Sequence, residues 1–110
     1  MNDPEQLASM FKIFSDPTRL RLFQLLQQCG RQTEAASCCD GALCVNALAA
    51  RLGVTQSAVS QHLRILRQAG LVRGERRGAF MHYVVDVQGW AKCKGVFLSA
   101  FEADTLEEQA

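Results

Sequence analysis

The 110-residue chain contains no apolar run that approaches the ~20 residues needed for a membrane-spanning helix. Its first residues are polar and acidic, which is not the pattern of a secretory signal. It also lacks internal repeats and low-complexity tracts. Because 48% of the residues are hydrophobic and 21% are charged, the composition is that of a globular protein. We therefore expect a single cytoplasmic domain over residues 1–110 that does not contact a membrane.

The net charge is only +1, but the charges are unevenly distributed along the chain. Between Arg51 and Arg77 there are six arginines and one acid, Glu75, so this segment carries a charge of +5. The tail from Glu102 onward has four acids and no base. This asymmetry favours a polyanion as the partner of the central segment, although an arginine-rich surface that is merely solvated would have the same composition.

Asp-Pro pairs mark the starts of the first two expected helices. In both Asp3-Pro4 and Asp16-Pro17, the acid is a good N-cap and the proline suits the first helical position. Apolar residues at helical spacing follow both pairs, and the second helix should end near Cys29-Gly30. The polar stretch 31–40 predicts a loop.

The middle of the chain has the pattern of a helix-turn-helix over about 43–70. The first of its helices should end at Gly53, and Thr55 should cap the second, which buries Val59, Leu63 and Leu66 and has Gly70 as its C-cap. Residues 71–85 have strand character with an expected turn at Arg77-Gly78, and helical spacing returns over about 87–103. A basic hairpin directly after a helix-turn-helix is typical of a wing.

At this point the sequence resembles the ArsR/SmtB family of dimeric winged helix-turn-helix repressors. The resemblance covers about Asp16 to Val85, and the residues that carry it are "SDPTRLRLFQLL", "LAARLGVTQSAVSQHLRILRQAGLV" and "RRGAFMHYVV". It implies a mainly α fold with a β-hairpin wing, in the order of four helices, two strands and a last helix. It also implies a transcriptional repressor, not an enzyme, that binds a palindromic double-stranded DNA operator.

A recognition helix presents polar side chains on its exposed N-terminal face, where they reach base edges in the major groove. Arginines of the wing and of the helix end are better placed to meet phosphates. We therefore expect the DNA-binding residues to be Gln56, Ser57, Ser60, Gln61, His62, Arg64, Arg67, Arg73, Arg76 and Arg77. Two alternatives remain: Gln56 and Ser57 only start the helix, and His62 packs in the turn instead of approaching a phosphate.

The two ends of the chain have more apolar residues than a lone winged domain needs. The resemblance implies that the first and last helices form the interface of a homodimer. The expected interface residues are Leu7, Met10, Phe11, Trp90, Phe97 and Phe101. Two recognition helices would then read half-sites about one helical turn apart, roughly 34 Å.

Three of the five cysteines, Cys38, Cys39 and Cys44, fall within the eight residues "SCCDGALC". One metal site of the family is a Cys-Val-Cys stretch at the start of the third helix, which binds arsenite, antimonite and other soft ions. In this chain Cys44 matches its first cysteine, and Asn46 stands where the second would be. A second family site uses Asp and His on the last helix for zinc, nickel or cobalt, and we reject it because that helix has no histidine.

Three thiolates form a soft ligand set that suits As(III), Sb(III) or another thiophilic ion, and no organic cofactor is expected. We expect the ion, bound by Cys38, Cys39 and Cys44, to act as an inducer that releases the repressor from DNA. The alternative is a redox or reactive-sulfur sensor, in which the same cysteines form a disulfide or polysulfide bridge. A third alternative is that they are unreactive loop thiols.

The remaining cysteines and histidines are expected to be structural. Cys93 should pack at the dimer interface, Cys29 should end the second helix, and His82 should belong to the DNA-binding scaffold. A thiol oxidoreductase is not favoured, because the chain has no Cys-x-x-Cys motif and no strand-helix-strand pattern. A winged domain that contacts only other proteins is a further alternative.

Overall fold

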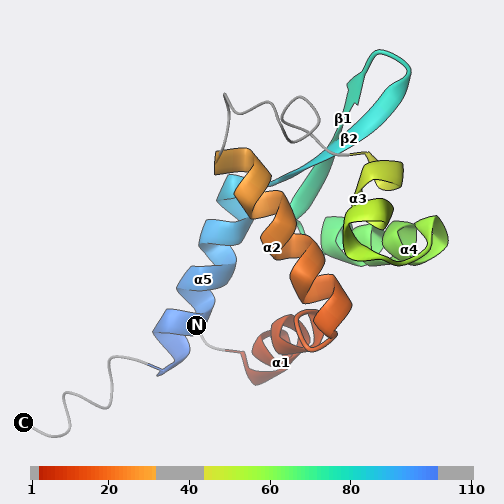
Figure 1. Cartoon of the computed structure of the whole chain (residues 1–110). Helices are drawn as coiled ribbons and strands as arrows, with labels where there is room; N and C mark the ends of the chain where they lie inside the picture. Colours follow the sequence, from red (N-terminus) through yellow and green to blue (C-terminus); the bar gives the residue numbers. More distant parts are fainter. Residues whose placement is uncertain (1–2, 32–43, 102–110) are drawn as a thin grey trace, which may run out of the picture.

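The computed structural model describes residues 3–31 and 44–101 of the chain (Figure 1). In these residues a two-stranded hairpin follows four helices and precedes a last one. The elements are α1 (Pro4–Ile13), α2 (Pro17–Arg31), α3 (Val45–Leu52), α4 (Gln56–Gln68), β1 (Val72–Arg77), β2 (Phe80–Val85) and α5 (Val87–Phe101). This order confirms the expected winged helix-turn-helix.

Both Asp-Pro pairs start helices as the sequence predicts. The Asp3 carboxylate accepts a hydrogen bond from the Glu5 backbone N–H, with a donor–acceptor distance of 3.0 Å. The Asp16 carboxylate accepts two, from the N–H groups of Thr18 and Arg19, at 2.9 and 3.1 Å. Helix α2 continues to Arg31, two residues past Cys29, and the rest of the expected loop lies outside the described residues.

The helix-turn-helix is formed by α3 and α4. Gly53 ends α3 in the left-handed conformation (φ 70°), and the Thr55 hydroxyl accepts from the Ala58 N–H at 3.0 Å to start α4. The expected bounds of about 43–70 shift slightly. Helix α3 begins at Val45 with Cys44 as its N-cap, and Ala69 is the C-cap of α4, directly before Gly70.

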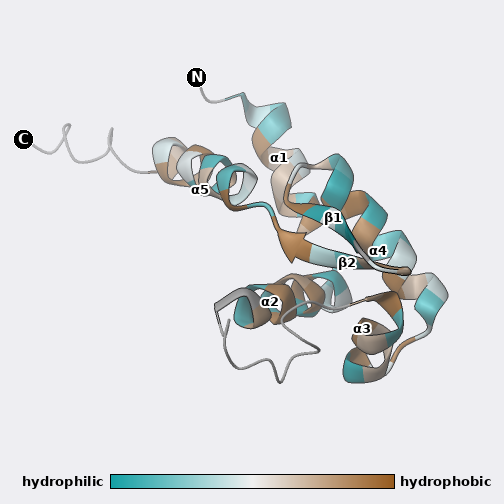
Figure 2. Ribbon diagram, turned by 90° about the horizontal axis from the view of Figure 1, so that it is seen from above, coloured by the Kyte–Doolittle hydropathy of each residue, from teal (hydrophilic) through white to brown (hydrophobic). Residues whose placement is uncertain are grey.

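The wing is an antiparallel hairpin whose register runs from Val72 opposite Val85 to Arg77 opposite Phe80. Its turn is therefore Gly78-Ala79, one residue later than expected, because Arg77 still belongs to the ladder. Gly78 has φ 65°, a conformation that two-residue hairpin turns require and that glycine adopts without strain. The base of β2 next to α5 is hydrophobic, and the strand packs against α2 (Figure 2).

The core lies where α2, α3, α4 and the base of the wing meet. Helix α5 runs on one side of α2, and α3 and α4 lie on the other (Figure 1). An aromatic group joins α5 to α2, because the Trp90 ring lies edge-on to Phe14 and Phe23 with centroid distances of 5.9 and 5.0 Å. The most deeply buried large side chains are Leu22, Phe23, Leu48, Val59, Leu66 and Leu71.

The end of α4 and the start of α5 meet backbone to backbone. The Asp86 N–H donates to the Leu71 carbonyl at 2.8 Å, and the Gly89 N–H donates to the Asp86 carboxylate at 3.0 Å. A Cβ atom added at Gly89 would overlap the carbonyl oxygen of Gly70. Only glycine fits this contact, so the two helices have a fixed point of close approach.

Candidate DNA interface and thiol site

One face of α4 is held inside the protein and the opposite face is open to solvent. The inward side chains, Val59, Leu63 and Leu66, are all buried in the core. The 3.6-residue period therefore turns the polar residues of the helix outward. Five expected base-reading residues are exposed there: Gln56, Ser57, Ser60, Gln61 and Arg64.

Arginines continue this polar face from α4 into the wing. Arg67 at the end of α4 and Arg76 on β1 are exposed. Arg73 is exposed as well, but its guanidinium donates to the Glu75 carboxylate at 3.0 Å. A surface ion pair of this kind is weak, so a phosphate can compete for Arg73. Arg77 ends β1, and its side chain lies outside the described part.

His62 has a different neighbourhood from the other expected DNA-binding residues. Its ring is half-buried, and its Nδ1 lies 3.1 Å from a guanidinium nitrogen (Nη1) of Arg19 on α2. Because a guanidinium only donates, Nδ1 is the acceptor and the ring proton is on Nε2. Arg19 is not among the residues expected from the sequence, because no local pattern indicates a contact across 43 residues.

His82 on β2 is half-buried and has a buried Nδ1 that makes no hydrogen bond. Its cross-strand partner in the ladder is Glu75. His82 is therefore a residue of the wing, and within the described residues no contact links its side chain to a cysteine.

Of the three clustered cysteines, only Cys44 lies in the described residues. It is half-buried at the start of α3, and its side chain makes no capping hydrogen bond. Cys38 and Cys39 lie outside the described range. Within residues 3–31 and 44–101, no group of three or more His, Cys, Asp or Glu side chains is arranged to hold a metal ion.

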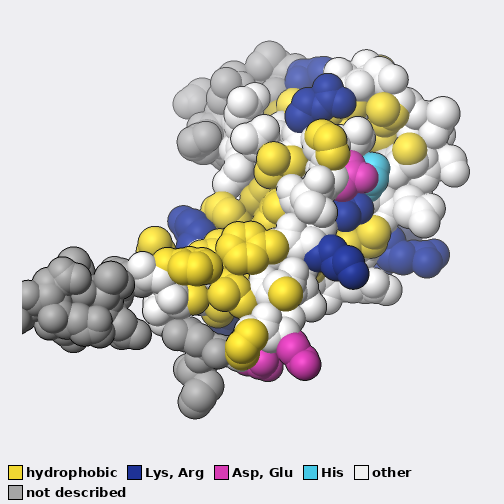
Figure 3. Space-filling model, turned by 90° about the horizontal axis from the view of Figure 1, so that it is seen from below, with side chains coloured by type: hydrophobic (Ala, Val, Ile, Leu, Met, Phe, Trp, Pro, Cys, Tyr) yellow, Lys and Arg dark blue, Asp and Glu magenta, His cyan; other side chains and the backbone are white. Residues whose placement is uncertain are grey.

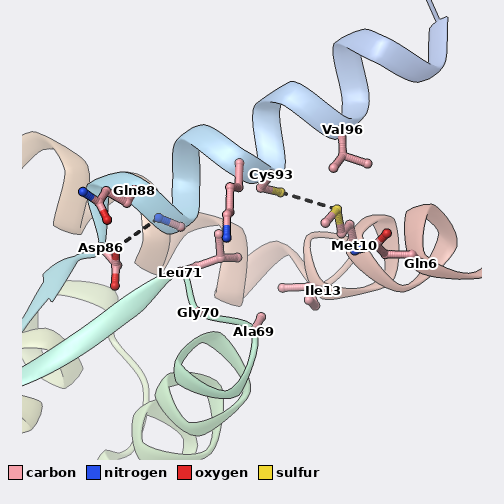
Figure 4. A pocket seen from close by; sticks show the side chains of 12 residues that line it. Gln6, Met10, Ile13, Ala69, Gly70, Leu71, Asp86, Gln88, Cys93 and Val96 are labelled. Atoms are coloured by element: carbon pink, nitrogen blue, oxygen red, sulfur yellow. Dashed lines mark hydrogen bonds between the residues drawn. The ribbon is translucent and has the colours of Figure 1, made fainter. Parts of the chain in front are cut away.

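The other two cysteines are interior residues. Cys29 is buried in the core at the end of α2. Cys93 on α5 is buried too, its thiol lies 3.8 Å from the Met10 thioether of α1, and this burial raises the pKa of the thiol (Figure 4). Cys93 and Met10 line a cavity of about 690 Å³ between α1, α5 and the turn after α4.

The expected interface residues of α5 differ in their surroundings. Trp90 packs on α2 within the protomer, and Phe97 stacks on Phe11 at a centroid distance of 4.9 Å. The large exposed apolar side chains of α5 are instead Val87, Leu98 and Phe101, at 71%, 62% and 66% exposure. The exposed Phe11 of α1 lies near Phe101, with ring centroids 6.2 Å apart, so both α1 and α5 expose apolar side chains, and Figure 3 shows hydrophobic side chains gathered on the face that it draws. Val87 and Leu98 are not among the interface residues expected from the sequence.

These elements define a class of protein: a DNA-binding winged helix-turn-helix domain. No helix in the described ranges is long and apolar enough to cross a membrane. Residues 16–73 match the family model of the bacterial regulatory proteins of the arsR family. The chain belongs to this family of transcriptional regulators.

Individual relatives agree with this assignment. The arsenical resistance operon repressor of Escherichia coli is 33% identical over 84 residues, which are 74% of this chain and 62% of that protein. A crystal structure described as a possible transcriptional regulator for arsenical resistance is 37% identical, with a TM-score of 0.66 over 92% of this chain and 95% of the other. A homodimeric winged helix-turn-helix DNA-binding domain from Mycobacterium bovis is 25% identical, with a TM-score of 0.61 over 87% and 79% of the two chains.

The comparisons bear on three expectations from the sequence. The relatives are DNA-binding regulators and not enzymes, as expected. The expected partners, double-stranded DNA and a second copy of the chain, are also those of the family. Homologues within the family respond to metal or metalloid ions as inducers.

Proposed function

We propose that this protein is a cytoplasmic repressor that leaves its operator when a soft metalloid, arsenite or antimonite, is bound by Cys38, Cys39 and Cys44. The observation that carries the proposal is the position of Cys44 at the N-cap of α3. A thiol at this point is next to the helix that supports the recognition helix. The similarity to the arsenical resistance operon repressor of Escherichia coli supports the choice of ion.

In this proposal α4 lies in the major groove of the operator. The exposed side chains near its N-terminus contact base edges, with glutamine suited to adenine and arginine to guanine. Arg67, Arg73, Arg76 and Arg77 contact phosphates on either side of the groove. His62 faces Arg19 within the protomer.

The dimer is proposed to form through α1 and α5. Leu7, Met10 and Phe11 contribute from α1, as expected from the sequence. On α5, the exposed Val87, Leu98 and Phe101 offer more unpaired apolar area than Trp90 and Phe97, which pack within the protomer. Burying the exposed set against a second copy removes it from water and holds the two α4 helices at a fixed spacing.

The donor chemistry at the thiol site suits a soft trivalent ion. Three cysteine sulfurs satisfy a pyramidal arsenic or antimony centre, with no need for imidazole or carboxylate. Cys44 is available as one donor because no capping hydrogen bond occupies its side chain. When bound, the ion would join the sulfurs of Cys38 and Cys39 to the N-cap residue of α3.

Helix α3 passes such a constraint to α4 because the two helices share one core. Leu48 of α3 is fully buried in the same cluster as Val59 and Leu63 of α4. A packed core of this kind shifts as a unit, so pulling on the start of α3 changes the tilt of the reading helix. A coupling free energy of about 1–3 kcal/mol would weaken DNA binding roughly 5–150-fold.

The test is a titration of arsenite into protein bound to fluorescent operator DNA, without oxygen and with a phosphine reductant that carries no thiol. We expect anisotropy to fall at near-stoichiometric arsenite for the wild type and for Cys93→Ala, the matched cysteine control. Cys44→Ser should bind DNA as tightly as the wild type and should not respond. Release of Cys44→Ser by arsenite would contradict the site.

The same protein–DNA complex distinguishes metalloid binding from the redox alternative. If arsenite has no effect, peroxide or polysulfide is added after the reductant is removed. Release under those conditions would assign the cysteines to a disulfide or polysulfide switch, and the metalloid proposal would be abandoned.

A further inference from the structure

Arg19 makes hydrogen bonds to three different parts of the fold. Its Nε donates to the carbonyl of Ile13, the last residue of α1, at 2.7 Å. Its Nη1 donates to Nδ1 of His62 on α4 at 3.1 Å. Its own backbone N–H donates to the Asp16 carboxylate at the start of α2. One half-buried side chain thus connects α1, α2 and the recognition helix.

Each of these bonds suits an arginine. The Ile13 carbonyl belongs to the last turn of α1, where carbonyls have no partner within the helix. The planar guanidinium directs two donors in fixed directions, so it can hold the carbonyl and the imidazole at once. A lysine has the same charge but a single ammonium group, which cannot reproduce this geometry.

His62 is turned away from the exposed reading face of α4. At about 100° per residue, His62 and Arg64 lie about 160° apart around the helix axis. Arg64 is exposed, whereas the His62 ring is half-buried and directed at α2. The neighbouring Asp16 is tied into the same corner, and its pKa is lowered chiefly by the hydrogen bond from the Arg19 backbone N–H.

We propose that Arg19 and His62 act as a positioning pair that sets the angle of α4 against the α1–α2 corner, and that neither side chain contacts the DNA. The proposal rests on the proposed function, in which α4 reads the operator. Because α1 also contributes to the proposed dimer surface, the pair connects that surface to the reading helix. Losing the link lets α4 tilt and misaligns its polar face with the groove.

The test is a double-mutant cycle on DNA affinity, measured at pH 8 with a duplex selected for binding to the wild type. Arg19→Lys and His62→Leu remove the link from either side, and both keep the charge balance. We expect each to weaken binding about tenfold, as for a lost hydrogen bond to a charged group. The double variant should bind no more weakly than the weaker single variant, because both changes break one link.

Further readouts separate positioning from contact and from simple instability. Arg19→Gln, which removes the charge as well as the link, should keep the wild-type slope of log affinity against log salt, since no phosphate contact is lost. His62→Asn offers Arg19 an oxygen acceptor near the Nδ1 position and should restore affinity to within threefold. Arg21→Lys, the control on an exposed arginine of the same helix, should change nothing.

Three results would overturn the proposal: additive losses in the double variant, a salt slope lower by about one for Arg19→Gln, or affinity losses that follow the unfolded fraction in a thermal melt. If the selection yields no duplex that the wild type binds specifically, the proposed function itself fails and this inference falls with it.

Discussion

Replacing Gly89 with alanine tests the contact between the end of α4 and the start of α5. The added methyl carbon would overlap the Gly70 carbonyl oxygen and lie 2.9 Å from the Gly70 carbonyl carbon. Both obstacles are backbone atoms, so no side-chain rotation relieves the overlap. Helix α5 has to move away, and the hydrogen bonds from Asp86 to Leu71 and from Gly89 to Asp86 are strained.

The magnitude follows from three opposing contributions. Overpacking costs about 1–3 kcal/mol, and each weakened hydrogen bond adds about 1 kcal/mol. Alanine returns about 1 kcal/mol through its higher helix propensity. The net loss should be about 2–4 kcal/mol of unfolding free energy, which for a domain of this size lowers Tm by roughly 10–30 °C.

The assay is thermal and urea unfolding followed by circular dichroism, at one protein concentration because dimerisation contributes to stability. Gly95→Ala is the matched control. Gly95 lies in the same helix as Gly89, and a Cβ atom added there would meet nothing within 4 Å. The Gly95→Ala variant should be up to about 1 kcal/mol more stable than the wild type. Its mass in solution should be measured as well, to confirm that it forms the same dimer. If Gly89→Ala is as stable as the wild type, the close approach of α4 and α5 is refuted.

Three other predictions concern the core, the helix cap and the thiols. Phe23→Ala should cost about 3–5 kcal/mol in urea unfolding, whereas Phe80→Ala on the exposed wing should cost almost nothing, and equal losses would contradict the core assignment. The Asp16 carboxyl has a pKa below its ordinary value of 3.8, so its stabilisation is present above that value and is lost as the pH falls through the folded pKa. The stability difference between wild type and Asp16→Asn should therefore shrink in acid melts, and a constant difference down to the lowest pH would argue against it. Iodoacetamide should label Cys44 faster than the buried Cys93, whose pKa is raised, in mass spectra of the folded protein, and equal rates before unfolding would disprove this.

Much of the fold was predictable because its signals are local. An Asp-Pro pair contains both the cap acceptor and a preset φ angle, so it identifies a helix start without knowledge of the rest of the chain. Thr55 and the inward Val59, Leu63 and Leu66 define α4 in the same way. The small boundary errors at the end of α4 and at the hairpin turn arose where cap and ladder hydrogen bonds, which the sequence does not display, decide the boundary.

The candidate site was predictable only in part. Periodicity alone identifies the exposed polar face of α4, because the buried face leaves one orientation for the rest. Periodicity does not identify which apolar residues of α5 stay exposed. From spacing alone, Trp90 could face the dimer partner or the protomer core, and its contacts with Phe14 and Phe23 show that it faces the core. The exposed Val87 and Leu98 were therefore missed.

The sequence by itself determined the order of the elements, the helix starts, the reading face of α4 and the family, because each depends on residues close together in the chain. Only the tertiary structure decided that Arg19 meets His62 and that Gly89 meets Gly70. Those contacts join residues 43 and 19 positions apart, and their geometry is set by how whole helices pack. A linear pattern contains spacing along the chain but not the angle between two helices.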